Sequence, residues 1–298
     1  MKLSATFELR DLALRLMSKL SYTLKPRSLE KRITSFPYLC SDTYEDLAQK
    51  SLLTHEDFTK FISGPSRSGV ISSVFVKANL VQLLIDNVND LPTIERLILI
   101  EDDVVLHVGS LSFLYSKVQK IFASNLIGST LQCKPIPLGI ERQVFRSAGK
   151  LKDFKKPVSI KPKDRDITFL VAWNDETNSQ RPLHRSRFMN RTDTLILSQR
   201  INASSLHSLM RKSMFVPSPA GNGPDCHRTW EAIYLGAVPV VLKSDFCGDE
   251  KWPILVVHDW SELLLKNAKQ LSDLYCAIAL NSRDSIEFGK SILEEMFG

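Results

Sequence analysis

Apolar residues follow two alternating patterns along most of this chain. Short apolar runs are separated by stretches in which apolar residues recur at helical spacing. Fully apolar strands of four to six residues between helices are typical of a parallel sheet buried on both faces. The pattern therefore predicts an α/β fold with doubly wound parallel sheets. Strands are predicted over 69–79, 95–103, 134–141, 167–173, 193–198, 214–219, 237–242 and 253–257. Helices are predicted over 80–88, 111–125, 204–213, 227–236, 261–281 and 284–297.

A basic stretch interrupts the alternation. Residues 142–165 carry nine Lys and Arg residues and two prolines, with almost no apolar periodicity, which is typical of a domain boundary. A length of 298 residues suits two α/β domains. We expect the following division of the chain: an N-terminal helix within 1–32, a first Rossmann-like domain over 33–150, a linker over 151–166, a second Rossmann-like domain over 167–270, and C-terminal helices over 271–298.

The N-terminal segment concentrates the positive charge. Residues 3–24 have the spacing of one amphipathic helix, and residues 1–32 contain eight Lys and Arg against three Asp and Glu. This segment thus carries +5 of a formal net charge of +6. A basic amphipathic helix can contact an anionic membrane surface, but it can equally pack on its own protein. Because the rest of the chain lacks a basic groove with interleaved aromatic residues, we expect no nucleic-acid partner.

Composition excludes several other classes of protein. Hydrophobic residues make up 43% and charged residues 24%, which are ordinary values for a globular protein. The five cysteines are widely spaced and form no CxxC pair, which argues against a disulfide framework and a structural zinc site. No apolar run is long enough to span a membrane. We expect a cytoplasmic protein, at most peripheral at the inner face of the membrane.

Residues 214–242 carry the most informative chemistry. They run as strand, Gly/Pro-rich turn, helix and strand, and such a turn presents backbone N–H groups to an anion at a helix N-terminus. Gly221 and Gly223 allow close approach of the backbone, and Asp225 can cap the following helix. Arg228 in the first helical turn can bind a diphosphate, and Glu231 can accept from two ribose hydroxyls. The plainer interpretation is a capped surface helix with an Arg–Glu salt bridge.

Several segments together resemble a known family. SPAGNGPDCHRTWEAIYLGAVPVVL, followed by WPILVVHDW at 252–260, resembles the nucleotide-sugar-binding half of exostosin-like glycosyltransferases. FLVAWNDETNSQRPLHR at 169–185 resembles the segment that opens their second domain. CKPIPLGIE at 133–141 resembles the strand before their interdomain linker, and residues 36–47 and 74–85 resemble the opening strands of their first domain. The resemblance runs in order from about residue 36 to 262.

This resemblance implies a GT-B architecture, in which two Rossmann-like domains face each other across a cleft. The donor nucleotide sugar would lie on the second domain and the acceptor, a glycan or lipid-linked glycan, on the first. The last helix would cross back to the first domain. The implied activity is an inverting hexosyl or pentosyl transfer without a required metal or other cofactor. The expected donor-binding residues are Gly221, Asn222, Gly223, Asp225, His227, Arg228, Glu231, Asn174, Asn178 and Arg181. For Asn174, Asn178 and Arg181, an exposed Asn-rich turn is an equal alternative.

Three acidic residues end the predicted strand 95–103. Inverting transfer needs a base for the acceptor proton, and a carboxylate at the carboxyl edge of a parallel strand can supply it. By resemblance Asp103 is the first candidate and Asp102 the second. Solvated strand-end charges remain an alternative. A second one is a metal-dependent GT-A enzyme in which Glu101, Asp102 and Asp103 hold Mn²⁺ or Mg²⁺. A third is a noncatalytic nucleotide-sugar or glycan-binding protein that has lost the base.

Overall fold

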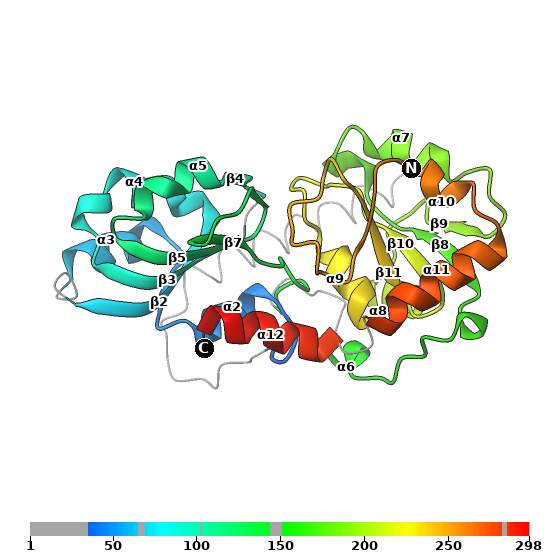
Figure 1. Cartoon of the computed structure of the whole chain (residues 1–298), viewed down its shortest axis with the longest axis horizontal. Coiled ribbons are helices and arrows are strands. Elements are labelled where there is room, and N and C mark those ends of the chain that lie inside the picture. Colours follow the sequence, from blue (N-terminus) through cyan, green and yellow to red (C-terminus); the bar gives the residue numbers. More distant parts are fainter. Residues whose placement is uncertain (1–34, 65–68, 102, 144–150, 282–284, 298) are drawn as a thin grey trace, which may run out of the picture.

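The computed structural model describes residues 35–64, 69–101, 103–143, 151–281 and 285–297. Within these residues, the two halves of the chain each build a five-stranded parallel sheet, and the two sheets lie side by side (Figure 1). The expectation of an α/β fold with parallel sheets is therefore confirmed. The predicted helix over 3–24 and the membrane contact of residues 1–32 lie outside the described residues.

The first sheet follows the order of the chain, β1-β2-β3-β5-β7. Its strands are β1 (Lys50–Leu52), β2 (Val70–Lys77), β3 (Thr93–Ile100), β5 (Val118–Ala123) and β7 (Cys133–Pro135). The connecting helices and turns are α2 (Ser41–Leu47), α3 (His55–Ser63), η2 (Ala78–Leu80), α4 (Val81–Asp86), η3 (Val88–Asp90), α5 (Val108–Leu111) and η4 (Ser112–Leu114). A separate small parallel pair is formed by β4 (Leu106–His107) and β6 (Leu126–Ile127).

The second sheet has the order β12-β11-β10-β8-β9. Its strands are β8 (Ile167–Val171), β9 (Thr194–Ile196), β10 (Ser213–Pro217), β11 (Val238–Leu242) and β12 (Leu255–Val257). The helices and turns of this half are α6 (Leu151–Phe154), η5 (Pro162–Asp164), η6 (Asp175–Thr177), α7 (Arg181–Arg187), α8 (Ala203–Met210), α9 (His227–Tyr234), α10 (Ser261–Leu264), α11 (Ala268–Asn281) and α12 (Ser285–Phe297). Because β9 lies on one side of β8 and β10 on the other, the strand order reverses between β8 and β10.

The central strands are buried because apolar side chains point to both faces of each sheet. In the first sheet, Val76 pairs in register with Leu99, and Leu99 with Ala123, on one face. The neighbouring residues Phe75 and Ile98 belong to the core on the other face. Successive side chains of a strand point to opposite faces, and both faces are buried here. The sequences of these strands are therefore continuously apolar.

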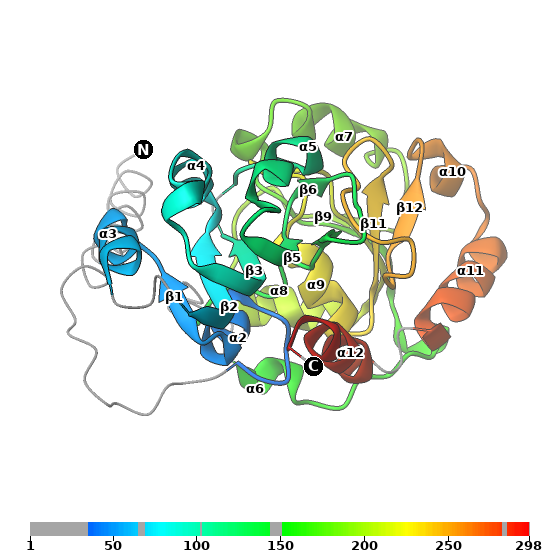
Figure 2. The same cartoon turned by 60° about the vertical axis from the view of Figure 1, so that its left-hand side comes forward.

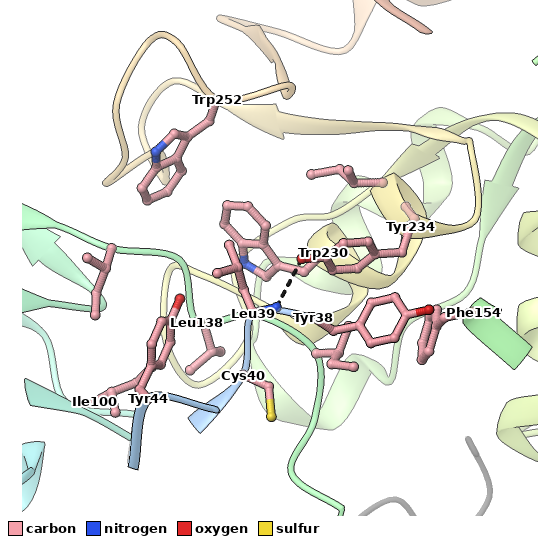
Figure 3. Close-up of a cluster of buried hydrophobic side chains, with 14 of the residues drawn as sticks. Tyr38, Leu39, Cys40, Tyr44, Ile100, Leu138, Phe154, Trp230, Tyr234 and Trp252 are labelled. Carbon is pink, nitrogen blue, oxygen red and sulfur yellow. Dashed lines mark hydrogen bonds between the residues drawn. The ribbon is translucent and has the colours of Figure 1, made fainter. Parts of the chain in front are cut away.

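One hydrophobic core connects the two halves of the chain. It contains Phe75 and Ile98 from the first sheet together with Leu170 and Val216 from the second. Trp230 of α9, 1% exposed, lies at its centre among residues of both halves (Figure 3). The backbone N–H of Leu39 donates to the hydroxyl of Tyr234 at 3.0 Å, which adds a buried polar link between the halves.

Helix α12 returns toward the first half of the chain, although it follows the second sheet in sequence, and it also contacts α9 of the second half (Figure 1 and Figure 2). Its residues Leu293 and Met296 belong to the shared core. Glu295 forms an ion pair with Lys134 of β7. A Cβ atom at Gly289 would lie 3.3 Å from the Tyr234 hydroxyl and 3.4 Å from the Pro37 carbonyl oxygen, so the helix approaches both closely.

The predicted helix over 111–125 is wrong in its second part. Helix α5 and the turn η4 end at Leu114, and residues 118–123 form β5, a strand inside the first sheet. Val118, Ile121 and Phe122 are spaced like one face of a helix, which explains the error. In the structure, Ile121, Phe122 and Ala123 are all buried because strand neighbours cover both faces.

Further segments differ from expectation. The predicted strand over 134–141 corresponds to β7, which ends at Pro135, and the predicted helix over 261–281 is divided into α10 and α11. Residues 36–47, whose sequence resembles an opening strand, form a turn followed by helix α2, while the strand β1 comes next at Lys50–Leu52. The segment after β8 contains the helix α7 in addition to the predicted turn. None of the helices that the structure describes is long and apolar enough to cross a membrane.

Candidate functional site

The loop over 218–226 leaves the second sheet where its strand order reverses. β8 and β10 are parallel neighbours, so their carboxyl ends, Val171 and Pro217, open on the same edge. In α/β sheets, connections that leave in opposite directions create a crevice in which ligands bind. Helix α9 begins at His227 directly after the loop, so its N-terminal amide groups start at this edge.

Arg181 supports this loop from within the protein. Its side chain is 3% exposed, and its nitrogens donate to the carbonyl oxygens of Ala220 at 2.8 Å and of Pro219 and Asn174 at 2.9 Å. It also donates to the hydroxyl of Thr177. Each of its three nitrogens therefore has an acceptor. The predicted donor-binding residue Arg181 shapes the loop rather than pointing a free hydrogen-bond donor at its surface.

The two glycines of the loop lie where a side chain would not fit. A Cβ atom at Gly221 would lie 2.9 Å from Nη2 of Arg181, and one at Gly223 would lie 3.0 Å from Nδ2 of Asn125. The Gly221 N–H donates to the Gly223 carbonyl oxygen at 2.9 Å and closes a tight turn. The glycines thus let the loop lie between an arginine of the second half and an asparagine of the first half.

Arg228 lies in the first turn of α9 and is only partly satisfied. Its Nε donates to the carbonyl oxygen of Ala172, the residue after β8, at 3.0 Å. Its Nη1 is buried and has no hydrogen-bond partner among the described residues. Burial lowers the pKa of this guanidinium, and the nearby Arg181 and Arg185 also lower it. An arginine remains charged in proteins, so a partly buried positive charge with an unused, buried donor lies at the crevice.

Arg185 differs from Arg228 although it lies nearby. It forms a salt bridge with Asp175 at 2.9 Å and donates to the carbonyl oxygens of Trp173 at 2.6 Å and Leu197 at 2.9 Å. Its charge is therefore compensated inside the protein. This leaves Arg228 as the group in this arginine cluster that an anion would satisfy.

Glu231 lies one helical turn after Arg228, as predicted, and contacts a histidine. Its Oε1 is 3.8 Å from Nε2 of His207, and the opposite ring nitrogen, Nδ1, is 3.4 Å from Oδ2 of Asp153. The Glu231 side chain is 15% exposed, whereas His207 is 2% and Asp153 6% exposed. Burial raises the pKa of Glu231, but His207, His227 and Arg228 lower it by more. The pKa of Glu231 is therefore below its ordinary value.

Asp225 and His227 face the first half of the chain. The Asp225 carboxylate accepts from the backbone N–H of Leu138 and from Nε1 of Trp230, each at 2.9 Å. Nδ1 of His227 lies 2.8 Å from the carbonyl oxygen of Gly139. The expectation that Asp225 caps α9 is wrong, because the N-cap residue is Cys226 and it makes no side-chain capping bond. Burial raises the pKa of Asp225 to about 6.

Asp103 lies next to the loop, on the opposite side of the crevice. Its carboxylate Oδ2 accepts a hydrogen bond from Nδ2 of Asn222 at 3.1 Å, and the side chain is exposed. The structure therefore brings the first catalytic candidate to the predicted donor loop, across 119 positions in sequence. Asp102, the second candidate, lies outside the described residues.

The Glu101 carboxylate lies in a cluster of charges. Its carboxylate is bound by Arg142, and Nζ of Lys77 lies 3.6 Å away. Arg142 also donates to Asp42, at 2.8 Å, and to Glu45. Burial raises the pKa of Glu101, which Arg142 and Lys77 partly offset. Glu101 is thus paired with two cationic side chains.

The two predicted asparagines differ in their relation to the loop. Asn178 donates from Nδ2 to the carbonyl oxygen of Gly221 at 3.2 Å, so it touches the loop. Asn174 is exposed, and its side chain accepts from the N–H of Glu176 at 3.2 Å as the cap of η6. The structure thus places Asn178 at the site and keeps Asn174 at the surface turn beside it.

Three residues near the site were not predicted from the sequence. Asn125 accepts from the Asp225 N–H at 3.0 Å, and its backbone has a positive φ of 51°. An asparagine at the end of a strand is favoured for this conformation, which was the available signal. His207 and Arg142 act through partners distant in sequence, and no local pattern marks them.

A cavity of about 710 Å³ lies away from this crevice, at the C-terminal end of α9. Residues from α9, α12 and the segment between the sheets line it, including Tyr38, Lys155, Ile233 and Ser285. Among the described residues, no group of three or more His, Cys, Asp or Glu side chains is arranged to hold a metal ion. The candidate site therefore consists of the loop 218–226, Arg228, Glu231 and Asp103.

The chain matches no protein-family model and no curated protein.

Proposed function

We propose that this protein is a glycosyltransferase of the GT-B type, which transfers a sugar from a nucleoside diphosphate sugar to a hydroxyl of a glycan or lipid-linked glycan. The observation that carries the proposal is Arg228. Its partly buried charge with an unpartnered Nη1 lies at the N-terminus of α9, at the point where the strand order reverses. A diphosphate would supply both the negative charge and the acceptor atoms that this guanidinium lacks.

The proposed roles follow from the positions of the side chains. Arg228 and the N-terminal amides of α9 would bind the diphosphate and stabilise the charge that grows on it as the anomeric C–O bond breaks. Glu231 would accept hydrogen bonds from the ribose hydroxyls. Asp103 would take the proton of the acceptor hydroxyl while the oxygen of that hydroxyl forms the new bond to the anomeric carbon. The nucleoside diphosphate would leave as the second product.

The contact between Asp103 and Asn222 supports this assignment of roles. In a direct displacement, the base and the leaving group lie on opposite sides of one sugar ring. Asp103 belongs to the first half of the chain and the loop to the second, and their hydrogen bond of 3.1 Å supports a base on one side and a donor on the other. The similarity of residues 133–141, 169–185 and 218–260 to exostosin-like enzymes supports the same arrangement.

Nucleotide binding is the first test. We expect one of UDP, GDP, ADP and CMP to raise the melting temperature of the full chain, because a ligand that binds only the folded state stabilises it. Arg228→Ala should abolish that shift. Arg187→Ala, which removes an exposed arginine of α7, is the matched control and should keep it. If Arg228→Ala folds and keeps the full shift, Arg228 does not hold the diphosphate.

Turnover is the second test. With the matching nucleotide sugar, release of the nucleoside diphosphate or transfer of the sugar to an acceptor would establish an enzyme. Asp103→Asn should then reduce the rate while leaving nucleotide binding intact. Binding without release in the presence of acceptor glycans would favour a noncatalytic nucleotide-sugar-binding protein instead. Loss of turnover on addition of EDTA would favour the metal-dependent alternative.

A further inference from the structure

A buried histidine connects the proposed ribose-binding carboxylate to the segment between the sheets. His207 of α8 lies between Asp153 of α6 and Glu231 of α9, at 3.4 Å and 3.8 Å. Ser204 also donates to Asp153, at 2.8 Å, and the ring of Phe154 packs on His207 with centroids 4.8 Å apart. Nε2 of His207 is buried and makes no hydrogen bond in the described part of the chain.

We propose that His207 is a positioning residue that holds the Glu231 carboxylate toward the ribose hydroxyls of the bound nucleotide, with Asp153 as its anchor. This inference rests on the proposed function, because it assigns a partner to Glu231 in the same site. Of the three side chains, only that of Glu231 is appreciably exposed, so only its carboxylate can be reached by a ligand. His207 and Asp153 act through it.

The charges around His207 favour its protonated form. Burial lowers the pKa of His207, but Glu231 and Asp153 raise it by more, and the net direction is up. The same contacts lower the pKa of Asp153 despite its burial. Other charged or titratable groups nearby are Lys156 and Arg211 beside Asp153, Tyr38 beside Arg211, and Arg228 and His227 beside Glu231.

The geometry gives His207 a directional role. A protonated imidazole donates from both nitrogens, one toward each carboxylate. At 3.8 Å from Nε2, Oε1 of Glu231 is attracted by the charge without a full hydrogen bond, so a small movement on binding can complete the contact. With Oε1 held by His207, the other carboxylate oxygen stays available for the ribose.

Two substitutions separate this role from simple packing. His207→Gln keeps an N–H donor near the position of Nε2 but cannot carry charge. His207→Asn keeps a donor near the position of Nδ1, toward Asp153, and loses the contact with Glu231. The readout is the affinity for whichever of UDP, GDP or ADP stabilises the chain, divided by the affinity for its 2′-deoxy analogue, measured by calorimetry.

We expect the wild-type chain to prefer the ribonucleotide about tenfold, as a hydrogen bond to a charged group implies. This preference should fall as the pH rises through the raised pKa of His207, because the neutral ring releases Glu231. His207→Gln should keep much of the preference but lose its pH dependence. His207→Asn should lower the preference to that of Glu231→Gln, and should leave the affinity for the deoxynucleotide unchanged.

The outcomes distinguish the inference from the proposed function. If the wild-type chain binds both nucleotides equally, or if His207→Asn keeps the full preference, His207 does not position Glu231, while diphosphate binding at Arg228 stands. If the wild-type chain binds no nucleotide, the proposed function fails and the inference fails with it. If His207→Asn weakens both nucleotides equally, its role is structural and the inference is overturned.

Discussion

The two sheets have the same number of strands, all parallel, but the arginines at their carboxyl edges have different hydrogen-bond and ion-pair partners. In the first sheet, Arg142 is surrounded by the carboxylates of Asp42, Glu45 and Glu101, so the protein supplies its own counter-charges. In the second sheet, Arg228 has one backbone acceptor and keeps Nη1 unpartnered. The two sheets also differ in strand order, which is sequential in the first sheet and reverses at β8 in the second.

The charge cluster around Arg142 is complete, because carboxylates of the protein pair with the arginine. The site around Arg228 is open, because one of its donors has no partner in the described part of the chain. A buried polar group without a partner costs stability, and a folded chain tolerates that cost where a ligand later supplies the partner. The first sheet, which has no reversal among its described strands, closes its edge with an internal salt-bridge network. The second keeps a buried donor of Arg228 without a hydrogen-bond partner at its crevice, which is why we propose that the donor substrate binds there.

Arg142→Ala tests the completed cluster and should have the largest effect. Removal of the arginine leaves the carboxylates of Asp42, Glu45 and Glu101 without the guanidinium that they share in a largely buried setting, which should lower the free energy of unfolding by about 3–5 kcal/mol. Urea unfolding followed by circular dichroism measures this change. A loss as small as that of Arg187→Ala would contradict the view that the first cluster is a structural network.

Arg181→Ala and Arg228→Ala sharpen the contrast within the second half. Arg181 satisfies three backbone carbonyl groups, so its removal should cost about 2–4 kcal/mol of stability. Arg228→Ala should change the stability of the ligand-free protein by no more than about 1 kcal/mol, because the buried Nη1 donor of Arg228 has no hydrogen-bond partner to lose among the described residues. Unfolding curves without nucleotide measure both. Equal losses in the two variants would remove the distinction between a support and an open site.

Asp225 should give a smaller effect than Arg142 or Arg181, and this effect depends on pH. Burial raises the pKa of this carboxyl from 3.8 to about 6, so the folded chain binds its proton more tightly than the unfolded chain does. The resulting stability is present below about pH 4 and is lost as the pH rises through 6. Between pH 4 and 7 the wild-type chain should therefore lose about 1–3 kcal/mol relative to Asp225→Asn.

The control for this prediction is Asp249→Asn, which replaces an exposed aspartate of the second half. Its stability difference from the wild type should stay constant between pH 4 and 7. A constant difference for Asp225→Asn as well would mean that Asp225 titrates normally in the folded chain.

Local sequence patterns predict the fold well where burial is continuous. β3, β10 and β11 were predicted within a few residues because both of their faces are covered and the apolar run has no other explanation. β5 was missed because the polar residues Gln119 and Lys120 between Val118 and Ile121 produce a helical spacing. Only its neighbours β3 and β7 make this segment a strand, and pairing with them is a property of the tertiary structure.

The candidate site shows the same limit. The glycines, Arg228 and Glu231 were predicted from one continuous segment, because a strand, turn and helix fix their relative positions. The contact of Asn222 with Asp103 crosses from one half of the chain to the other. The support by Arg181 and the contact of His207 with Glu231 also join distant segments. Such contacts depend on how the halves pack, which residue spacing alone does not determine.

The hydrophobic core that crosses between the sheets has a practical consequence for dividing this chain. Trp230, Tyr234 and Leu39 are buried against residues of both halves, and α12 completes the same core from the far end of the sequence. A fragment that stopped before residue 167, or one that began there, would present this surface to water, and exposed apolar area of that kind promotes aggregation. Split reporters, domain swaps with other proteins and C-terminal truncations that remove α12 should therefore be avoided, and fusion partners should be placed in exposed loops.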